Sequence, residues 1–286
     1  MTSPGSKRVD SHQHFWQLSR FEYTWMPPGQ NPLRRDYVPA DLRPLLDAAG
    51  IDQTIVVQAH QSVEETRWLL KLADANPWIG GVVGWVDLTA PNVGETLDEL
   101  RQHPKLRGIR HIVHDEQDDR WLLRPDVLRG LGEVASRGLT YDLLFRPQHL
   151  TLARPLAERW PELRLVVDHI AKPPIRQGIR EPWARGIAEV ARIPGVHCKL
   201  SGMVTEADHA AWKPQDLEPY VAHVVEHFGA ARLMFGSDWP VCLLAASYQR
   251  VVDAVQVCLD RLGVGPEAQA GIFGANAARF YGLDGS

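Results

Sequence analysis

The chain alternates short runs of apolar, β-branched residues with longer stretches of helical spacing, and this alternation restricts the possible folds most strongly. The apolar runs predict eight strands, at Val9–Phe15, Gln53–His60, Ile79–Leu88, Leu106–His114, Leu139–Phe145, Leu163–Ile170, Val196–Leu200 and Leu233–Asp238. Helices are predicted between them at Val63–Ala75, Asn92–His103, Asp126–Arg137, Leu150–Trp160, Pro182–Arg192 and Leu217–Phe228, then after Ala245 and around Glu267–Phe280. Such alternation over roughly 250 residues predicts an α/β protein of one domain, a (β/α)8 TIM barrel. An open doubly wound sheet fits less well because no Gly-x-Gly-x-x-Gly follows the first strand.

A proline-rich segment, Gln17–Asp41, follows the first predicted strand. Its prolines are incompatible with a regular helix. A long loop at that position leaves the barrel mouth, so we predict an ordered lid or rim that shapes a pocket, with simple wrapping of the surface as the alternative. Residues 1–7 are expected to be a flexible leader and residues 8–286 the barrel domain.

Composition limits the partners of the chain. Lys and Arg number 31 against 35 Asp and Glu, which gives a net charge of −4 and no field to attract nucleic acid or an anionic membrane. The three cysteines lack the spacing of a disulfide framework or zinc ribbon. The leader has no signal-peptide run, and no stretch reaches the roughly 20 apolar residues of a membrane span. We therefore predict a cytoplasmic protein that acts on a small molecule, with an oligomeric state that the composition does not indicate.

Polar residues collect at the ends of the predicted strands. His12 and His14 are two apart, so their imidazoles point the same way, either to hold a metal, to polarise a carbonyl, or as a solvated strand end. Barrel enzymes place their chemistry at the carboxyl ends of the strands. The polar residues at the predicted ends are His12, His14, Gln58, His60, Arg110, His111, His114, Asp115, Glu116, Asp142, Arg146, Asp168, His169, Lys172, Lys199 and Asp238. This concentration predicts an active site at that end.

Asp238 closes the last strand and is the candidate general base, with a helix N-cap or a structural ion pair as the alternative. His169 offers an imidazole from the opposite wall. Strand alternation places Asp10 on the face of His12, and it places Asp168 on the face away from His169, which makes Asp168 the weaker catalytic candidate. Without a Gly-x-Ser-x-Gly elbow or a P-loop, covalent catalysis is not expected.

Three segments in barrel order resemble the amidohydrolase superfamily, in particular its lactonase branch of L-fuconolactonases, L-rhamnonolactonases and 2-pyrone-dicarboxylate lactonases. They read Asp-Ser-His-Gln-His-Phe-Trp at 10–16, Val-Asp-His-Ile-Ala-Lys-Pro at 167–173 and Phe-Gly-Ser-Asp-Trp-Pro at 235–240. The segments 34–39, 108–116 and 198–202 are most similar to the sugar-lactone members, and the resemblance covers nearly the whole chain. It implies hydrolysis of a cyclic ester, with His12, His14 and His169 around the lactone carbonyl and Asp238 activating water.

The chain departs from the metal-rich members of that superfamily. The fourth predicted strand has no obvious lysine for a bridging ligand, and Tyr141–Phe145 has no histidine. A binuclear centre is therefore not expected. The resemblance implies either no required cofactor or one divalent ion, zinc or manganese. The four residues that would hold that ion are His12, His14, His169 and Asp238.

The resemblance and the polar residues together favour a sugar lactone of the L-fucono or L-rhamnono type as substrate. Trp16 is expected to pack on the sugar ring, with Trp25 or Trp239 as further candidates. Residues expected to contact substrate polar groups are Gln58, His60, Arg110, His111, His114, Asp115 and Glu116. A pyrone dicarboxylate would need several cations, which Arg110, Arg146 and Lys172 could supply, but acidic neighbours would repel a dianion. Alternatives are that pyrone lactonase, a metal-dependent decarboxylase or amide hydrolase, and a catalytically silent barrel that binds sugar acids.

Overall fold

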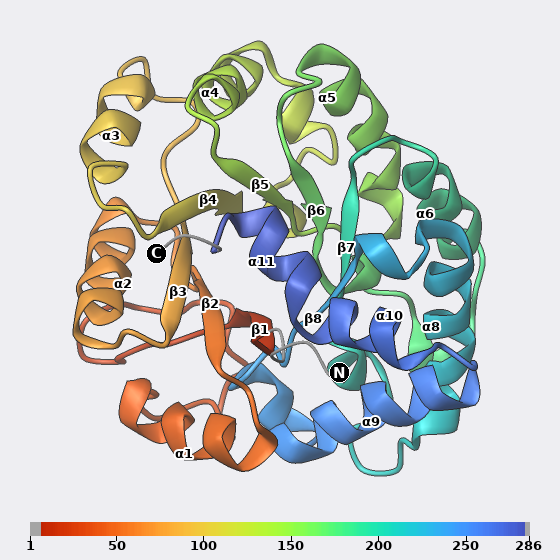
Figure 1. The fold of residues 1–286 in the computed structure, drawn as a ribbon. Helices are drawn as coiled ribbons and strands as arrows, with labels where there is room; N and C mark the ends of the chain where they lie inside the picture. Colours follow the sequence, from red (N-terminus) through yellow and green to blue (C-terminus); the bar gives the residue numbers. More distant parts are fainter. Residues whose placement is uncertain (1–6, 284–286) are drawn as a thin grey trace.

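A computed structural model describes residues 7–283 and contains a barrel of eight parallel strands in sequence order (Figure 1). The strands are β1 (Val9–Gln13), β2 (Gln53–Val57), β3 (Ile79–Gly84), β4 (Leu106–His111), β5 (Thr140–Leu143), β6 (Leu165–Val167), β7 (His197–Leu200) and β8 (Leu233–Phe235). Gln13, the last residue of β1, forms a parallel bridge with Trp239, which lies just after β8, and this bridge brings the first and last strands together. The predicted single-domain TIM barrel is confirmed.

Helices surround the strands and connect them. They are α1 (Pro39–Ala49), α2 (Val63–Ala75), α3 (Val93–Leu100), α4 (Pro125–Ser136), α5 (Ala153–Arg159), α6 (Trp183–Ala191), α7 (Met203–Glu206), α8 (Pro214–Phe228), α9 (Tyr248–Arg261), α10 (Pro266–Ala270) and α11 (Asn276–Tyr281). Of the helices between residues 7 and 283, none has the length and apolar character needed to cross a membrane. The predicted leader, residues 1–7, lies outside the described residues except for Lys7.

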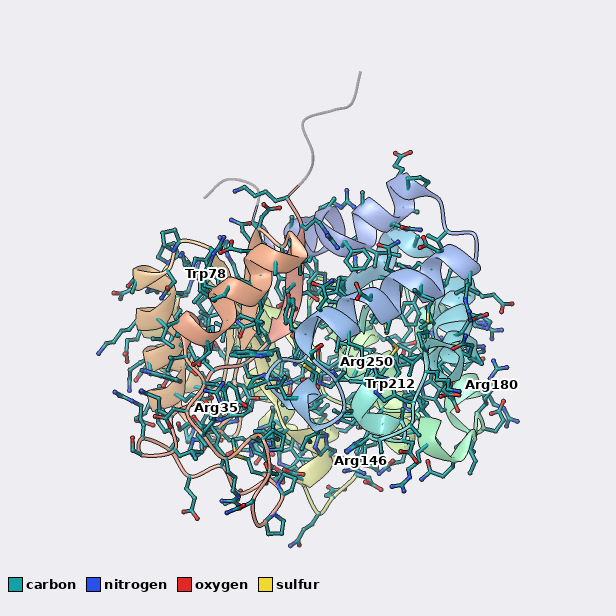
Figure 2. All side chains as sticks on the ribbon, turned by 90° about the horizontal axis from the view of Figure 1, so that it is seen from below. Arg35, Trp78, Arg146, Arg180, Trp212 and Arg250 are labelled. Carbon is teal, nitrogen blue, oxygen red and sulfur yellow. The ribbon has the colours of Figure 1, made fainter. Side chains whose placement is uncertain are left out.

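One end of the barrel is covered by α11, which lies across it in Figure 1. Apolar side chains of five strands form one buried cluster with α11, because parallel strands bury both faces. The strand members of this cluster are Val9, Ile55, Val57, Val83, Val166 and Met234. Figure 2 shows Trp78, which precedes β3, and Arg146, which follows β5, toward opposite ends of the molecule. The strand ends near Arg146 are therefore the open mouth.

Seven of the eight predicted strands extend too far at their carboxyl ends, and two helices, α1 and α7, were not predicted. β6 ends at Val167, and the next turn carries His169, Ile170, Ala171 and Lys172 at φ values of 45° to 59°, which no strand can adopt. The helix α1 begins with Pro39 at its first turn, a position that proline suits. The irregular segment after β1 therefore ends at Val38 rather than at Asp41.

Residues 17–38, called the rim below, are held together by aromatic side chains. Trp16 and Tyr37 exchange two backbone hydrogen bonds of 3.0 and 2.9 Å at its base. The Trp16 ring contacts those of Tyr23, Trp25 and Tyr37 at centroid distances of 6.0, 5.6 and 5.4 Å. The segment therefore has a small core of its own beside the barrel mouth.

Candidate active site

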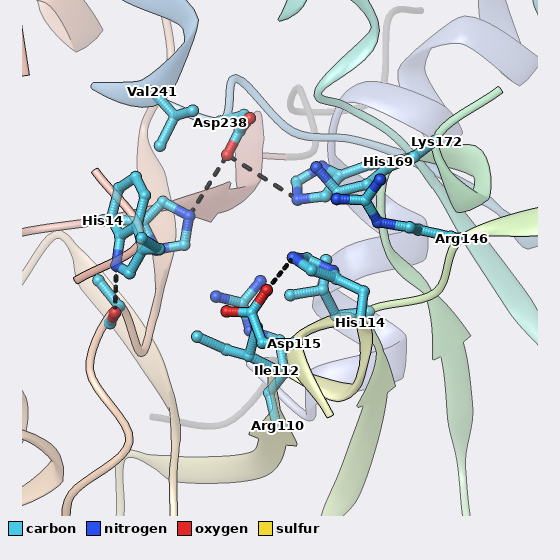
Figure 3. A pocket seen from close by; sticks show the side chains of 13 residues that line it. His14, Arg110, Ile112, His114, Asp115, Arg146, His169, Lys172, Asp238 and Val241 are labelled. Carbon is cyan, nitrogen blue, oxygen red and sulfur yellow. Dashed lines mark hydrogen bonds and ion pairs between the residues drawn. The ribbon is translucent and has the colours of Figure 1, made fainter. Parts of the chain in front are cut away.

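A cavity of about 290 Å³ opens at the carboxyl ends of the strands (Figure 3). Its walls are formed by His14, Trp25, Ala59, Arg110, Ile112, His114, Asp115, Leu144, Arg146, His169, Lys172, Asp238 and Val241. These residues lie in or after six of the strands, β1, β2, β4, β5, β6 and β8. Closure of the barrel thus gathers side chains that are far apart in the sequence.

Four of the predicted catalytic side chains meet at one side of this cavity. Asp238 Oδ1 lies 3.3 Å from His14 Nε2, 3.9 Å from His169 Nε2 and 4.0 Å from His12 Nε2. The two Nε2 atoms of His12 and His14 are 3.2 Å apart. Figure 3 shows Asp238 between His14 and His169, with the two contacts drawn as dashed lines. His12 is fully buried beneath them.

Hydrogen bonds to the outer ring nitrogens orient the imidazoles. His14 Nδ1 lies 2.8 Å from the Val57 carbonyl oxygen, so this nitrogen donates and the lone pair of Nε2 faces Asp238. Arg110 can only donate, and its Nη1 atom lies 3.2 Å from His12 Nε2, so Nε2 is the acceptor and Nδ1 carries the proton, 3.3 Å from Asp168 Oδ1. His169 Nδ1 contacts the Ser201 hydroxyl at 2.9 Å. Burial lowers the pKa of His12 and of His169 well below the usual value, so both rings are neutral at neutral pH.

The backbone at the end of β8 sets the place of Asp238. A Cβ on Gly236 would lie 2.7 Å from the Cβ of His12, so this close approach of β8 to β1 requires glycine. Asp238 has φ of 56°, a left-handed conformation that aspartate tolerates better than most residues. Its N–H donates to the His12 carbonyl at 2.8 Å. The strand ends of β1 and β8 therefore hold Asp238 and the His12 imidazole in a fixed relation.

Asp10 fastens the same two strands from outside the cavity. Its carboxylate accepts from the backbone N–H groups of His12 and Ser237 at 3.1 and 2.9 Å, and from the Tyr248 hydroxyl at 3.1 Å. The prediction that Asp10 shares the face of His12 is wrong, because the pairing register of β1 shifts between Asp10 and Gln13 and interrupts the alternation.

Asp238 is buried, and its environment favours the carboxylate. Burial opposes ionisation, but the imidazoles of His169 and His14 and the ammonium of Lys172 outweigh it, and the pKa of Asp238 falls below its usual value. The side chain is therefore ionised at neutral pH. A carboxylate at the wall of a cavity, with its charge intact, can accept a proton from water.

A layer of buried ion pairs lies below the imidazoles. Lys199 Nζ contacts Asp142 Oδ2 at 2.5 Å and Asp168 Oδ1 at 2.9 Å. Arg110 Nη1 contacts Asp168 Oδ2 at 3.1 Å and His12 Nε2 at 3.2 Å. Asp168 therefore supports His12 from below. Strand alternation does not apply to its neighbour His169, because that residue lies in the left-handed turn after β6.

Three of the predicted substrate-binding residues line the cavity, namely Arg110, His114 and Asp115. Burial and the nearby Lys172 and Arg146 lower the pKa of His114 to about 3, so its ring is neutral. Its Nδ1 atom is buried without a hydrogen-bond partner in the part of the chain that the structure describes. Neutral histidine both donates and accepts, which suits sugar hydroxyls.

Five predicted binding residues are turned away from the cavity. The Trp16 indole is fully buried in the rim and donates to the Leu33 and Arg35 carbonyls. The remaining four make other contacts: Gln58 accepts from Arg110, His60 stacks on Phe21, and His111 stacks on Trp121 and bonds Glu116 at 2.7 Å. The expectation that these five face the substrate is corrected, because none of them lines the cavity and each is held by another residue instead.

Apart from Trp25, which was a candidate for packing on the sugar ring, the apolar wall residues were not predicted, because polar side chains give the clearer signal of a site in a sequence. Ile112 lies two positions after Arg110, and Leu144 lies two positions after Asp142. Side chains two apart on a strand point the same way, and Arg110 and Asp142 point into the barrel, so this alternation predicts that Ile112 and Leu144 face the cavity. Trp25 is the one rim residue on the wall, and its indole N–H donates to the Ala59 carbonyl at 2.8 Å. The cavity thus has an apolar side as well as a polar one.

Comparisons with known proteins agree with this geometry. The family model described as amidohydrolase matches residues 9–283. Two L-fucono-1,5-lactonases, from Burkholderia ambifaria and Burkholderia multivorans, are 42% and 40% identical to this chain, covering 97% and 98% of it and 96% and 97% of their own lengths. The crystal structure of an amidohydrolase from Burkholderia multivorans with bound zinc is 38% identical, with a TM-score of 0.91 over 97% of this chain and all of that one.

Proposed function

The chain belongs to the amidohydrolase family, and from that premise we propose that it is a lactonase that opens a sugar lactone of the L-fucono or L-rhamnono type to the sugar acid. The observation that carries this proposal is the convergence of the ionised Asp238 with three imidazoles on one wall of a cavity of sugar size. The names of the full-length relatives support the class of substrate.

In the proposed reaction, Asp238 accepts a proton from water while the water oxygen bonds to the lactone carbonyl carbon. The carbonyl oxygen becomes an oxyanion. The tetrahedral intermediate then expels the ring oxygen, which takes the proton back from Asp238 and leaves a hydroxyl and a carboxylic acid. His169 Nε2, whose other nitrogen contacts Ser201, is placed to donate to the oxyanion, and the Arg110 guanidinium adds positive potential.

His14 has a different part in this arrangement. Its Nε2 lone pair faces Asp238 Oδ1 at 3.3 Å, and two electron-rich atoms at that distance need a proton or a cation between them. His12 Nε2 lies beside them, so three donor atoms converge as in a site for one divalent ion. Zinc or manganese would fit His12, His14 and Asp238, with His169 adjacent. When bound, the ion would supply Lewis-acid polarisation of the carbonyl.

The cations of the cavity favour a neutral lactone over a pyrone dicarboxylate. Lys172 is paired with Glu206 at 3.2 Å, and Arg110 is engaged by Asp168 and by Gln58. Among the described residues this leaves Arg146 as the wall cation without an ion pair, whereas a dicarboxylate needs two. Asp115 on the same wall would repel a dianion.

The experiment is a comparison of substrates with the purified protein. L-fucono-1,5-lactone, an L-rhamnonolactone and 2-pyrone-4,6-dicarboxylate are supplied at matched concentrations, and acid release is followed by a pH indicator with the spontaneous rate subtracted. We expect turnover of the sugar lactones. Turnover of the pyrone dicarboxylate alone would refute the proposed substrate class, and inactivity toward all three lactones would refute the proposed lactonase activity.

A further inference from the structure

A buried carboxyl group lies outside the catalytic cluster, at the first turn of α2. Glu65 is fully buried, and its Oε2 accepts from the backbone N–H groups of Ala59 and His60 at 2.9 and 2.8 Å. Its own backbone N–H is capped by the Ser62 hydroxyl at 3.2 Å. Glu65 therefore fixes the loop that follows β2, one residue of which, Ala59, is on the cavity wall.

The other oxygen of this carboxyl group reaches the rim. The Tyr23 hydroxyl lies 3.3 Å from Glu65 Oε1, and both side chains are buried. Two residues after Tyr23, the Trp25 indole N–H donates to the carbonyl oxygen of Ala59. The backbone N–H of the same residue, Ala59, donates to Glu65. Glu65 is thus the common anchor of Ala59 and of the rim segment that carries Trp25.

We propose that Glu65 and Tyr23 are positioning residues that set the place of Trp25 on the cavity wall and thereby control how tightly the lactone binds. The inference rests on the proposed function, because Trp25 is the aromatic wall residue against which the apolar face of a sugar ring would pack. The rim is proline-rich and irregular, so it lacks the repeated backbone hydrogen bonds that hold a helix or a sheet together. Side-chain contacts of this kind must hold it in place instead.

The chemistry of the anchor provides a conservative variant. Burial raises the pKa of Glu65 to about 8, so the group is mostly uncharged at neutral pH. A glutamine side chain has the same shape, can accept from the two N–H groups through its oxygen, and can donate to the Tyr23 oxygen. Glu65→Gln should therefore keep the arrangement that Glu65→Ala removes.

The test compares steady-state kinetics on the sugar lactone. Tyr23→Phe and Glu65→Ala are expected to raise KM by about 3- to 10-fold with kcat within about twofold, as loss of a buried hydrogen bond would. Glu65→Gln should restore the wild-type KM. The matched control is Tyr37→Phe, which deletes another rim hydroxyl, one that bonds the Pro32 carbonyl rather than the anchor, and should leave KM unchanged.

A double variant separates positioning from general loosening. If Tyr23 acts through Trp25, the KM of Tyr23→Phe with Trp25→Ala should equal that of Trp25→Ala alone. Multiplied effects in the double variant, or an unchanged KM in Tyr23→Phe, would overturn the inference.

A readout without substrate keeps this outcome distinct from failure of the proposed function. Amide hydrogen exchange at Ala59 and His60 should quicken at least tenfold in Glu65→Ala and stay at the wild-type rate in Glu65→Gln. Equal exchange in all three proteins would overturn the anchoring role of Glu65 even if no lactone is hydrolysed. Inactivity of the wild-type protein with the expected exchange pattern would refute only the lactonase proposal.

Discussion

Replacing Asp238 by asparagine is the most direct test of the proposed mechanism. The substitution keeps the shape of the side chain, and asparagine adopts the φ of 56° found here as readily as aspartate does, so the turn after β8 should persist. The new amide can donate to the His14 lone pair, which now lies 3.3 Å from Asp238 Oδ1. The variant therefore removes the base and leaves the fold intact.

The expected loss follows from what a general base contributes. Such a group accelerates a reaction by about 10²–10⁴-fold, so kcat should fall by that factor, equivalent to about 3 to 5 kcal/mol in activation free energy. The assay is initial-rate acid release from a sugar lactone, with spontaneous hydrolysis subtracted and folding checked by circular dichroism. A control on the same wall is Asp115→Asn, which removes an equal charge from a residue that takes no part in proton transfer in the proposed mechanism and should act mainly on KM. A folded Asp238→Asn protein with the kcat of the wild type would refute the reasoning.

Three further predictions concern stability and metal. Burial raises the pKa of Glu65 from 4.5 to about 8, so between these pH values the folded state holds one more proton than the unfolded state, and the free energy of unfolding declines as pH rises. Glu65→Gln should flatten this decline when unfolding by urea is followed from pH 5 to 8. The control Glu64→Gln, at an exposed neighbouring residue, should not. Lys199→Met leaves two buried carboxylates without their shared cation and should destabilise the fold by about 3–5 kcal/mol in the same assay, against less than about 0.5 for the exposed Lys71→Met. If one divalent ion supports catalysis, elemental analysis should find about one zinc or manganese per chain, and chelation should lower kcat until the ion is restored; full activity of metal-free protein would show that the side chains suffice.

The barrel was predictable because its signal is repeated eight times. Each strand is a short apolar run, and a single ambiguous run does not alter the pattern. His12, His14, His169 and Asp238 come together for the same reason, since the carboxyl ends of parallel strands meet at one end of a barrel. Position along a strand was sufficient to place these four residues near one another.

Orientation was less predictable, because it depends on where a strand stops. His60, His111 and Glu116 lie in or next to the loops that follow the strands. His60 stacks on an aromatic ring of the rim, and His111 stacks on another aromatic ring and bonds Glu116, so none of the three lines the cavity. Asp10 lies before a register shift in β1, and a shift of one residue moves a side chain to the other face. The sequence carries no visible mark of either event. Trp16 was predicted to face the substrate, but its large ring packs among the aromatic side chains of the rim. The sequence did not indicate that the rim has an aromatic core of its own.

The two layers of the site are the reason for proposing Asp238 as the base rather than another of the buried carboxylates. In the lower layer, Lys199 pairs with both Asp142 and Asp168, and Arg110 also pairs with Asp168, so two cations balance two carboxylates. Lys199 and His12 hold the pKa of Asp168 well below its usual value despite its burial, and a carboxylate held in that way is a poor proton acceptor. Asp238 instead faces imidazoles and the cavity, where water and lactone can reach it. Both layers are needed. The lower layer fixes His12, and because its own charges are balanced, the carboxylate charge that faces the substrate is that of Asp238 in the upper layer.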